Sequence, residues 1–89
     1  MPARSFTVRT SGGMHARPWA RFVGVTSRYR DVAVTVVKDG LQADGKSLLG
    51  LLTLEAEPGS TLEVTAEGDG AETLLGELTE LLSKDLDQE

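Results

Sequence analysis

The sequence predicts an α+β fold in which three helices cover one face of a four-stranded antiparallel sheet. Segments with strand and helix periodicity follow one another in the order β-α-β-β-α-β-α, and each expected helix has one apolar stripe. Three of the expected strands alternate apolar and polar residues, which is typical of a sheet with one face in solvent. The chain has 89 residues, so residues 1–89 are expected to form one small domain.

A strand and a helix are expected first. Residues 4–9 alternate in polarity, with Phe6 and Val8 facing inward. A loop then leads into a helix predicted over residues 16–27. The inner stripe of this helix follows the spacing i, i+3, i+4, i+7: Trp19, Phe22, Val23 and Thr26. Gly24 costs the helix about 1 kcal/mol relative to alanine, and it marks either close packing or an early end.

A hairpin and a short helix come next. Residues 31–37 form the strongest strand, with alternating valines, and Asp39-Gly40 favours the tight turn that returns the chain into a short strand over residues 41–43. Ser47 is a good N-cap for a helix extending to about residue 54. Leucines cover most of the circumference of this helix, so some of them are expected at the surface.

The last part of the chain reads as a strand followed by a helix. Residues 61–67 alternate cleanly, and Asp69 with Glu72 resembles a capping box. The most regular helical stripe follows: Leu74, Leu75, Leu78, Leu81 and Leu82. Residues 85–89 are expected to be a frayed tail, because acidic charge is disfavoured at the C-terminus of a helix.

Composition excludes several classes of function. The chain has no cysteine and one histidine, so we expect no metal site, and nothing indicates a cofactor. It lacks both a membrane span and a secretory signal, which predicts a cytoplasmic protein without membrane insertion. A net charge of −5 argues against nucleic-acid binding. Six arginines nevertheless lie in the first third of the chain, which either steers an acidic partner or reflects accidental clustering.

The stretch with the clearest chemistry is residues 12–18, Gly-Gly-Met-His-Ala-Arg-Pro. Proline is favoured in the first turn of a helix, so His15 is expected where a glycine-rich loop enters a helix. A helix start offers unpaired N–H groups and the positive end of the macrodipole, and here Ala16 and Arg17 would supply an anion site. A nucleophilic imidazole beside such a site indicates that His15 carries a phosphoryl group.

Residues 13–18 resemble the active-site signature of HPr, the histidine-containing phosphocarrier of the bacterial phosphoenolpyruvate-dependent sugar phosphotransferase system. Residues 45–54 are similar to the regulatory serine helix of that family, and the resemblance runs through essentially the whole chain. It implies an open-faced sandwich fold and a monomer. It also implies that His15 accepts a phosphoryl group on Nδ1 from phospho-enzyme I, with Arg17 as its charge partner, and passes the group to sugar-specific enzyme IIA domains.

Ser47 allows two interpretations. It is either a structural N-cap or a regulatory site phosphorylated by an HPr kinase/phosphorylase, in which case a catabolite regulator is a further partner. The resemblance also implies a surface that docks enzyme I and enzyme IIA beside His15, predicted to consist of Met14, Ala20, Leu48, Leu49 and Leu52. Trp19 departs from the family, which has a small residue there. Trp19 either adds to the core or lies over the active-site loop.

The leading function is therefore a stoichiometric phosphocarrier for sugar uptake rather than an enzyme. The alternative is an HPr-like regulatory binding module of a nitrogen-related or carbon-catabolite branch. A stand-alone enzyme is poorly supported, because nothing in the sequence pairs His15 with a base, a metal or a deep substrate pocket.

Overall fold

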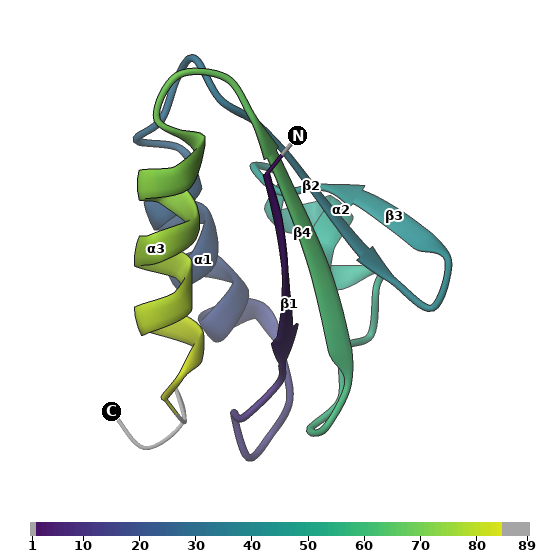
Figure 1. Ribbon diagram of the computed structural model, residues 1–89. Helices are drawn as coiled ribbons and strands as arrows, with labels where there is room; N and C mark the ends of the chain where they lie inside the picture. The colour runs from purple at the N-terminus through teal and green to yellow at the C-terminus, as the bar shows by residue number, and fades with distance from the viewer. Residues whose placement is uncertain (1, 85–89) are drawn as a thin grey trace.

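A computed structural model describes residues 2–84. Its helices and strands follow the predicted order (Figure 1): β1 (Ala3–Thr7), α1 (Ala16–Thr26), β2 (Ala33–Lys38), β3 (Leu41–Asp44), α2 (Leu48–Leu52), β4 (Thr61–Glu67) and α3 (Ala71–Leu82). The expectation of a frayed tail concerns residues 85–89, which lie outside the described part of the chain.

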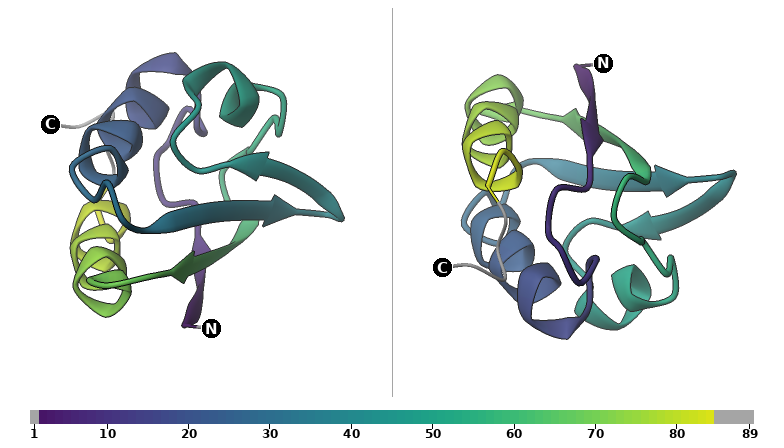
Figure 2. Two further views of the ribbon diagram at one scale, coloured as in Figure 1. Left: turned by 90° about the horizontal axis from the view of Figure 1, so that it is seen from above. Right: turned by 90° about the horizontal axis from the view of Figure 1, so that it is seen from below.

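The strands form one sheet in the order β1-β4-β2-β3, and every neighbouring pair is antiparallel. The helices lie together on one face of the sheet, and the other face is open (Figure 2). This arrangement confirms the predicted open-faced sandwich. It also brings the start of α1 and the short helix α2 to the same end of the molecule, because α1 and α2 pack against each other.

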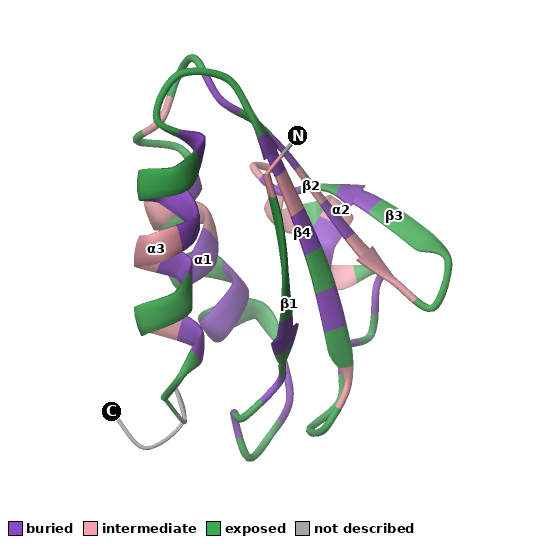
Figure 3. Cartoon of the chain, in the orientation of Figure 1, coloured by how far each residue is buried: buried purple, intermediate pink, exposed green. Residues whose placement is uncertain are grey.

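Alternation along the strands places the core between sheet and helices (Figure 3). In β4 the side chains of Leu62, Val64 and Ala66 are fully buried, while Thr61, Glu63 and Glu67 are exposed. The α3 stripe meets this layer as predicted, with Leu74, Leu75 and Leu78 fully buried. Burial of a large aliphatic side chain contributes about 1.5–3 kcal/mol, so this layer is the main source of stability.

The tight turn between β2 and β3 has the predicted chemistry. Asp39 has φ +52° and Gly40 has φ +82°, the left-handed conformations that an Asp-Gly turn tolerates. The register pairs Lys38 with Leu41 directly across this turn.

The predicted capping box at Asp69 is wrong. The residue that caps α3 is Gly70, in a left-handed conformation (φ +97°), and no side chain caps the helix. The chain reaches this point through Gly68, where an added Cβ would lie 2.1 Å from the carbonyl oxygen of Asp31. The close backbone contact at Gly68 and the left-handed conformation of Gly70 therefore set the start of α3, and Asp69 remains exposed.

Neither prediction for Gly24 holds. The residue is exposed, no described atom outside its chain neighbours and its own helical backbone lies within 4 Å of an added Cβ, and α1 continues to Thr26. The alternatives for Trp19 are decided in favour of the core. Its side chain is fully buried and meets Phe22 edge to face, with ring centroids 5.1 Å apart. The indole N–H has no hydrogen-bond partner among residues 2–84.

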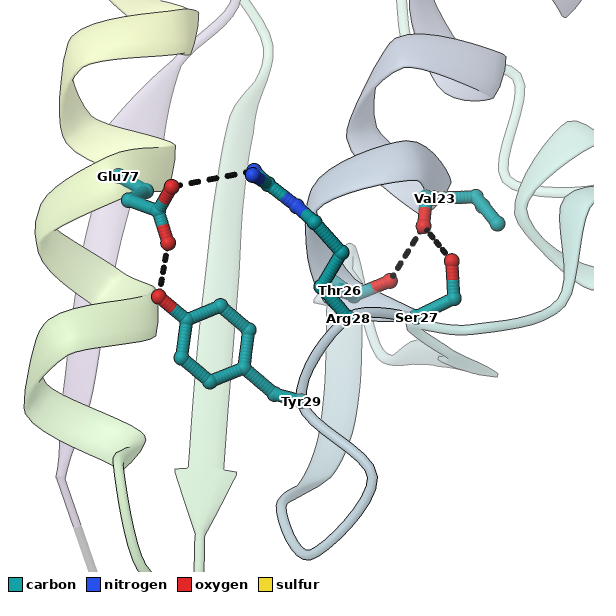
Figure 4. A network of polar contacts seen from close by, with 6 residues as sticks. All are labelled: Val23, Thr26, Ser27, Arg28, Tyr29 and Glu77. Atoms are coloured by element: carbon teal, nitrogen blue, oxygen red, sulfur yellow. Dashed lines mark hydrogen bonds and ion pairs between the residues drawn. The ribbon is translucent and has the colours of Figure 1, made fainter.

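Polar contacts tie the end of α1 to the rest of the fold (Figure 4). The Tyr29 hydroxyl donates a hydrogen bond to the Glu77 carboxylate on α3, and Arg28 forms an ion pair of 3.1 Å with the same carboxylate. The buried hydroxyl of Thr26 donates to the carbonyl oxygen of Gly45, at 2.7 Å, just before α2. The segment after α1 is thus held to α3 and to the approach to α2.

The hydrogen bond to Glu77, together with partial burial and the Glu77 charge, raises the pKa of Tyr29 above its usual value of about 10. Because the pKa of Tyr29 is higher in the folded state than in the unfolded state, its interactions stabilise the fold. This stabilisation is complete below the unfolded-state pKa and is lost as the pH rises through the folded-state pKa. Tyr29 is the only tyrosine, so ultraviolet absorbance of tyrosinate measures it directly. We expect a midpoint above 10, which falls towards about 10 in Glu77→Gln. Glu80→Gln, on the same helix, is the control. An equal midpoint in wild type and Glu77→Gln would contradict the assignment.

Candidate functional site

The loop before α1 is fixed by close backbone contact with the loop before β4. The Met14 N–H donates to the carbonyl oxygen of Ala56 at 2.7 Å, and Gly13 has φ +78°. A Cβ on Gly13 would lie 2.9 Å from that same oxygen and 3.3 Å from the Cα of Glu57. Glycine is therefore required at this position both for its conformation and for space.

His15 stands where this loop becomes α1. It is the N-cap residue, with extended backbone angles (φ −91°, ψ −165°), and its carbonyl oxygen accepts the Trp19 N–H at 3.1 Å. The imidazole is exposed and does not cap the helix. The N–H groups of Ala16 and Arg17 have no intrahelical acceptor, because both residues lie in the first turn. Pro18, also in this turn, has no N–H group. The predicted junction of loop and helix is confirmed.

The electrostatics around His15 favour an anion. The first turn of α1 carries no acidic residue, and its N–H groups lie at the positive end of the helix dipole. Arg17, two residues from His15, is exposed and forms no ion pair within residues 2–84. The start of α1 thus combines an exposed imidazole, unpaired backbone donors and a guanidinium that is available to a ligand.

Ser47 is the predicted N-cap of α2. Its side-chain oxygen accepts the Gly50 N–H at 3.2 Å, a contact that contributes about 1 kcal/mol. An added Cβ on Gly50 would lie 3.3 Å from the same oxygen, so glycine there leaves room for the cap. Before it, the Lys46 ammonium donates to the Tyr29 carbonyl oxygen at 2.5 Å and fixes the approach to the helix.

The leucines of α2 divide between core and surface, although not as predicted. Leu49 is 79% exposed, which agrees with the prediction, whereas Leu48 and Leu52 are half-buried against the core. Leu51 is fully buried. The helix makes little more than one turn, so the side chains flanking its exposed residue are still drawn towards the core.

Ala20 is exposed on α1 as predicted, but the surface position expected for Met14 is wrong. Its side chain is 5% exposed and belongs to the core. Of the residues predicted for the docking surface, Ala20 and Leu49 are therefore exposed, whereas Leu48 and Leu52 are half-buried against the core.

Sequence reasoning missed the supporting role of residues 55–58. Glu55 has φ +51°, an uncommon conformation for a residue other than glycine. This turn sets the carbonyl of Ala56 against the loop that carries His15. Nothing in the residue types marks it, because a glutamate gives no signal for a left-handed conformation.

Within residues 2–84, no group of three or more His, Cys, Asp or Glu side chains is arranged to hold a metal ion. In the same residues, no helix has the length and apolar character needed to cross a membrane.

Comparison with known proteins identifies the family. Residues 2–84 match the family model described as the phosphotransferase system HPr component phosphorylation site. The chain belongs to the HPr family. It is 34% identical to the phosphocarrier protein HPr of Pseudomonas aeruginosa over 88 residues, which are 99% of this chain and 98% of that protein. This confirms the resemblance seen in the sequence, and HPr proteins are carriers of the phosphotransferase system rather than catalysts.

Two other relatives of this HPr-family chain bear on fold and function. The crystal structure of HPr-C-His from Thermoanaerobacter tengcongensis superposes with a TM-score of 0.92 at 29% identity, covering 100% of this chain and 99% of that one. The HPr-like protein Crh of Halalkalibacterium halodurans is 29% identical over 85 residues, 96% of this chain and 100% of that protein. The relatives of this chain thus include both phosphocarrier proteins and an HPr-like protein.

Proposed function

We propose that this chain accepts a phosphoryl group on Nδ1 of His15 from phospho-enzyme I and passes it to enzyme IIA domains. The observation that carries the proposal is the exposed imidazole at the N-cap of α1, with Arg17 two residues further on. In the transfer, the Nδ1 lone pair attacks phosphorus while the bond from phosphorus to the donor atom of enzyme I breaks. The proton on Nε2 stays in place, and the reverse sequence at an enzyme IIA acceptor restores the neutral ring.

The site suits a carrier because it stabilises the phosphoryl group only moderately. The N–H groups of Ala16 and Arg17 and the Arg17 guanidinium offset its added negative charge. The imidazole is exposed, so the group stays accessible to the next acceptor. Partner proteins then supply most of the positioning that speeds transfer.

The first experiment mixes the protein with enzyme I and phosphoenolpyruvate. We expect an acid-labile mass gain of one phosphoryl group, absent in His15→Ala and passed on when an enzyme IIA domain is added. Arg17→Gln should slow phosphorylation by about tenfold, the effect of losing roughly 1.4 kcal/mol of transition-state stabilisation. Arg30→Gln, at another exposed arginine, is the control. Full phosphorylation of His15→Ala would exclude the proposal. Phosphorylation without transfer to any enzyme IIA would favour the alternative, a regulatory binding module.

Leu49 and Ala20 are proposed as the exposed centre of the docking surface for both partners, with Leu48 and Leu52 at its base. The 79% exposed Leu49 side chain has no role in the core that explains an apolar residue there. Met14 is left out of this surface, because its side chain is only 5% exposed.

Leu49→Glu tests this surface. We expect KM for enzyme I to rise by about five- to tenfold, because a charge replaces an apolar contact worth about 1 kcal/mol or more. The melting temperature should not change, since the side chain is exposed. Leu41→Glu is the matched control, because Leu41 is 55% exposed on β3. Equal KM values for both variants would remove Leu49 from the docking surface.

Regulation through Ser47 is a second proposal. The cap leaves the hydroxyl half-buried at the first turn of the helix that carries Leu49. A phosphate there would add about 1.5–2 negative charges beside the docking surface and repel acidic partner groups.

An HPr kinase with ATP should give an acid-stable phosphate that is absent in Ser47→Asn. Asparagine keeps an N-cap acceptor without a hydroxyl, so stability should stay within a few tenths of a kcal/mol of wild type. Ser47→Ala should lose both the phosphate and about 1 kcal/mol of stability, measured by denaturant unfolding. An undiminished acid-stable phosphate in Ser47→Asn would rule out this residue.

A further inference from the structure

Strand β1 lies at one edge of the sheet, with α3 beside it (Figure 1). Hydrogen bonds at both ends of β1 fix which of its residues face β4. Val8 donates to the Ser60 carbonyl at 2.8 Å, and the Pro2 carbonyl accepts the Ala66 N–H at 3.0 Å. Even-numbered residues of β1 therefore bond to the neighbouring strand.

In an antiparallel ladder, residues alternate between those that bond to the neighbour and those that face away from it. The N–H and C=O groups of Ala3, Ser5 and Thr7 consequently face the open edge. No backbone group within residues 2–84 pairs with them there. Such an edge is a template for a further strand unless the protein blocks it with proline or inward charge.

A groove of about 430 Å³ runs along this edge. Arg4, Ser5, Thr7 and Arg9 line it on the β1 side, and Thr79 and Ser83 line it on the α3 side. None of its described lining residues is acidic, although the chain has a net charge of −5. The groove thus combines free backbone groups, hydroxyls and two arginines.

The two arginines differ in whether the guanidinium already has a partner within the described chain. Arg4 is already oriented, because its guanidinium donates to the Thr79 hydroxyl at 2.8 Å and lies 3.6 Å from the Glu72 carboxylate. Arg9 is exposed and forms no ion pair with any residue from 2 to 84. Arg9 therefore supplies the available charge, at the end of the groove nearest the loop that leads to His15.

We propose that this groove binds an extended acidic segment of a partner protein, which adds to the sheet as a fifth strand beside β1. Main-chain hydrogen bonds to Ser5 and Thr7 would hold the segment, and carboxylates facing Arg9 and Arg4 would select it. This binding is separate from the proposed phosphoryl transfer and requires neither enzyme I nor His15. The two proposals can therefore fail independently.

The test uses the full-length, 15N-labelled protein and the capped peptide acetyl-Glu-Val-Glu-Thr-Glu-Val-Glu-amide. At a peptide concentration about four times Kd, amide hydrogen exchange at Ser5 and Thr7 should slow by about fivefold. The amides of Arg4 and Phe6, already bonded to β4, are internal controls and should not change. Unchanged exchange at Ser5 and Thr7 under these conditions overturns the proposal.

Variants and a second peptide check the chemistry. Arg9→Gln should weaken binding by about three- to tenfold, whereas Arg30→Gln should leave it unchanged. Thr7→Pro removes an outward N–H without breaking the β1–β4 ladder, and it should also weaken binding. The same peptide with lysine in place of glutamate should not bind. If the lysine peptide binds as tightly as the glutamate peptide, the groove does not select acidic segments and this part of the proposal is overturned. If dimerisation that depends on protein concentration protects Ser5 and Thr7, the edge of β1 binds a second copy of the chain instead.

Discussion

The contact between Met14 and Ala56 is the constraint on which the arrangement of the site depends. One hydrogen bond of 2.7 Å and one glycine, Gly13, bring two loops together at backbone distance. This contact turns the Met14 side chain into the core and leaves the next residue, His15, at the helix start. The backbone in this way places an exposed imidazole at the first turn of α1.

The short helix α2 serves the core and the surface within five residues. Leu51 is fully buried and Leu49 is 79% exposed, while Leu48 and Leu52 are half-buried. The Ser47 cap fixes where the helix begins and therefore which leucine faces outward. Structural capping and the proposed regulation of Ser47 are compatible, since a modification at the cap would act on the surface that the same helix presents.

The elements with strong periodicity could be predicted from the sequence. Alternation in β4 and the leucine stripe of α3 depend on burial of one face, which residue type reports directly. The errors at Asp69 and Met14 have another origin: in both places a backbone contact between distant segments, of Gly68 with Asp31 and of Met14 with Ala56, decides the conformation. Glu55 was missed for the same reason, because its positive φ follows from the loop it must close and not from its own preference. Local patterns thus predicted the junction of loop and helix at His15, but not the loop that supports it.

The clustering of arginines in the first third of the chain resolves into separate roles. Arg28 is held by Glu77 and fastens the segment after α1 to α3. Arg4 fastens β1 to the same helix through Thr79, whereas Arg9 and Arg17 form no ion pair within residues 2–84. These two flank the loop that carries His15, one before it and one after it. Because the remainder of the chain is predominantly acidic, an acidic partner would be drawn to this end and repelled elsewhere. Such steering orients the approach of a partner before any specific contact forms.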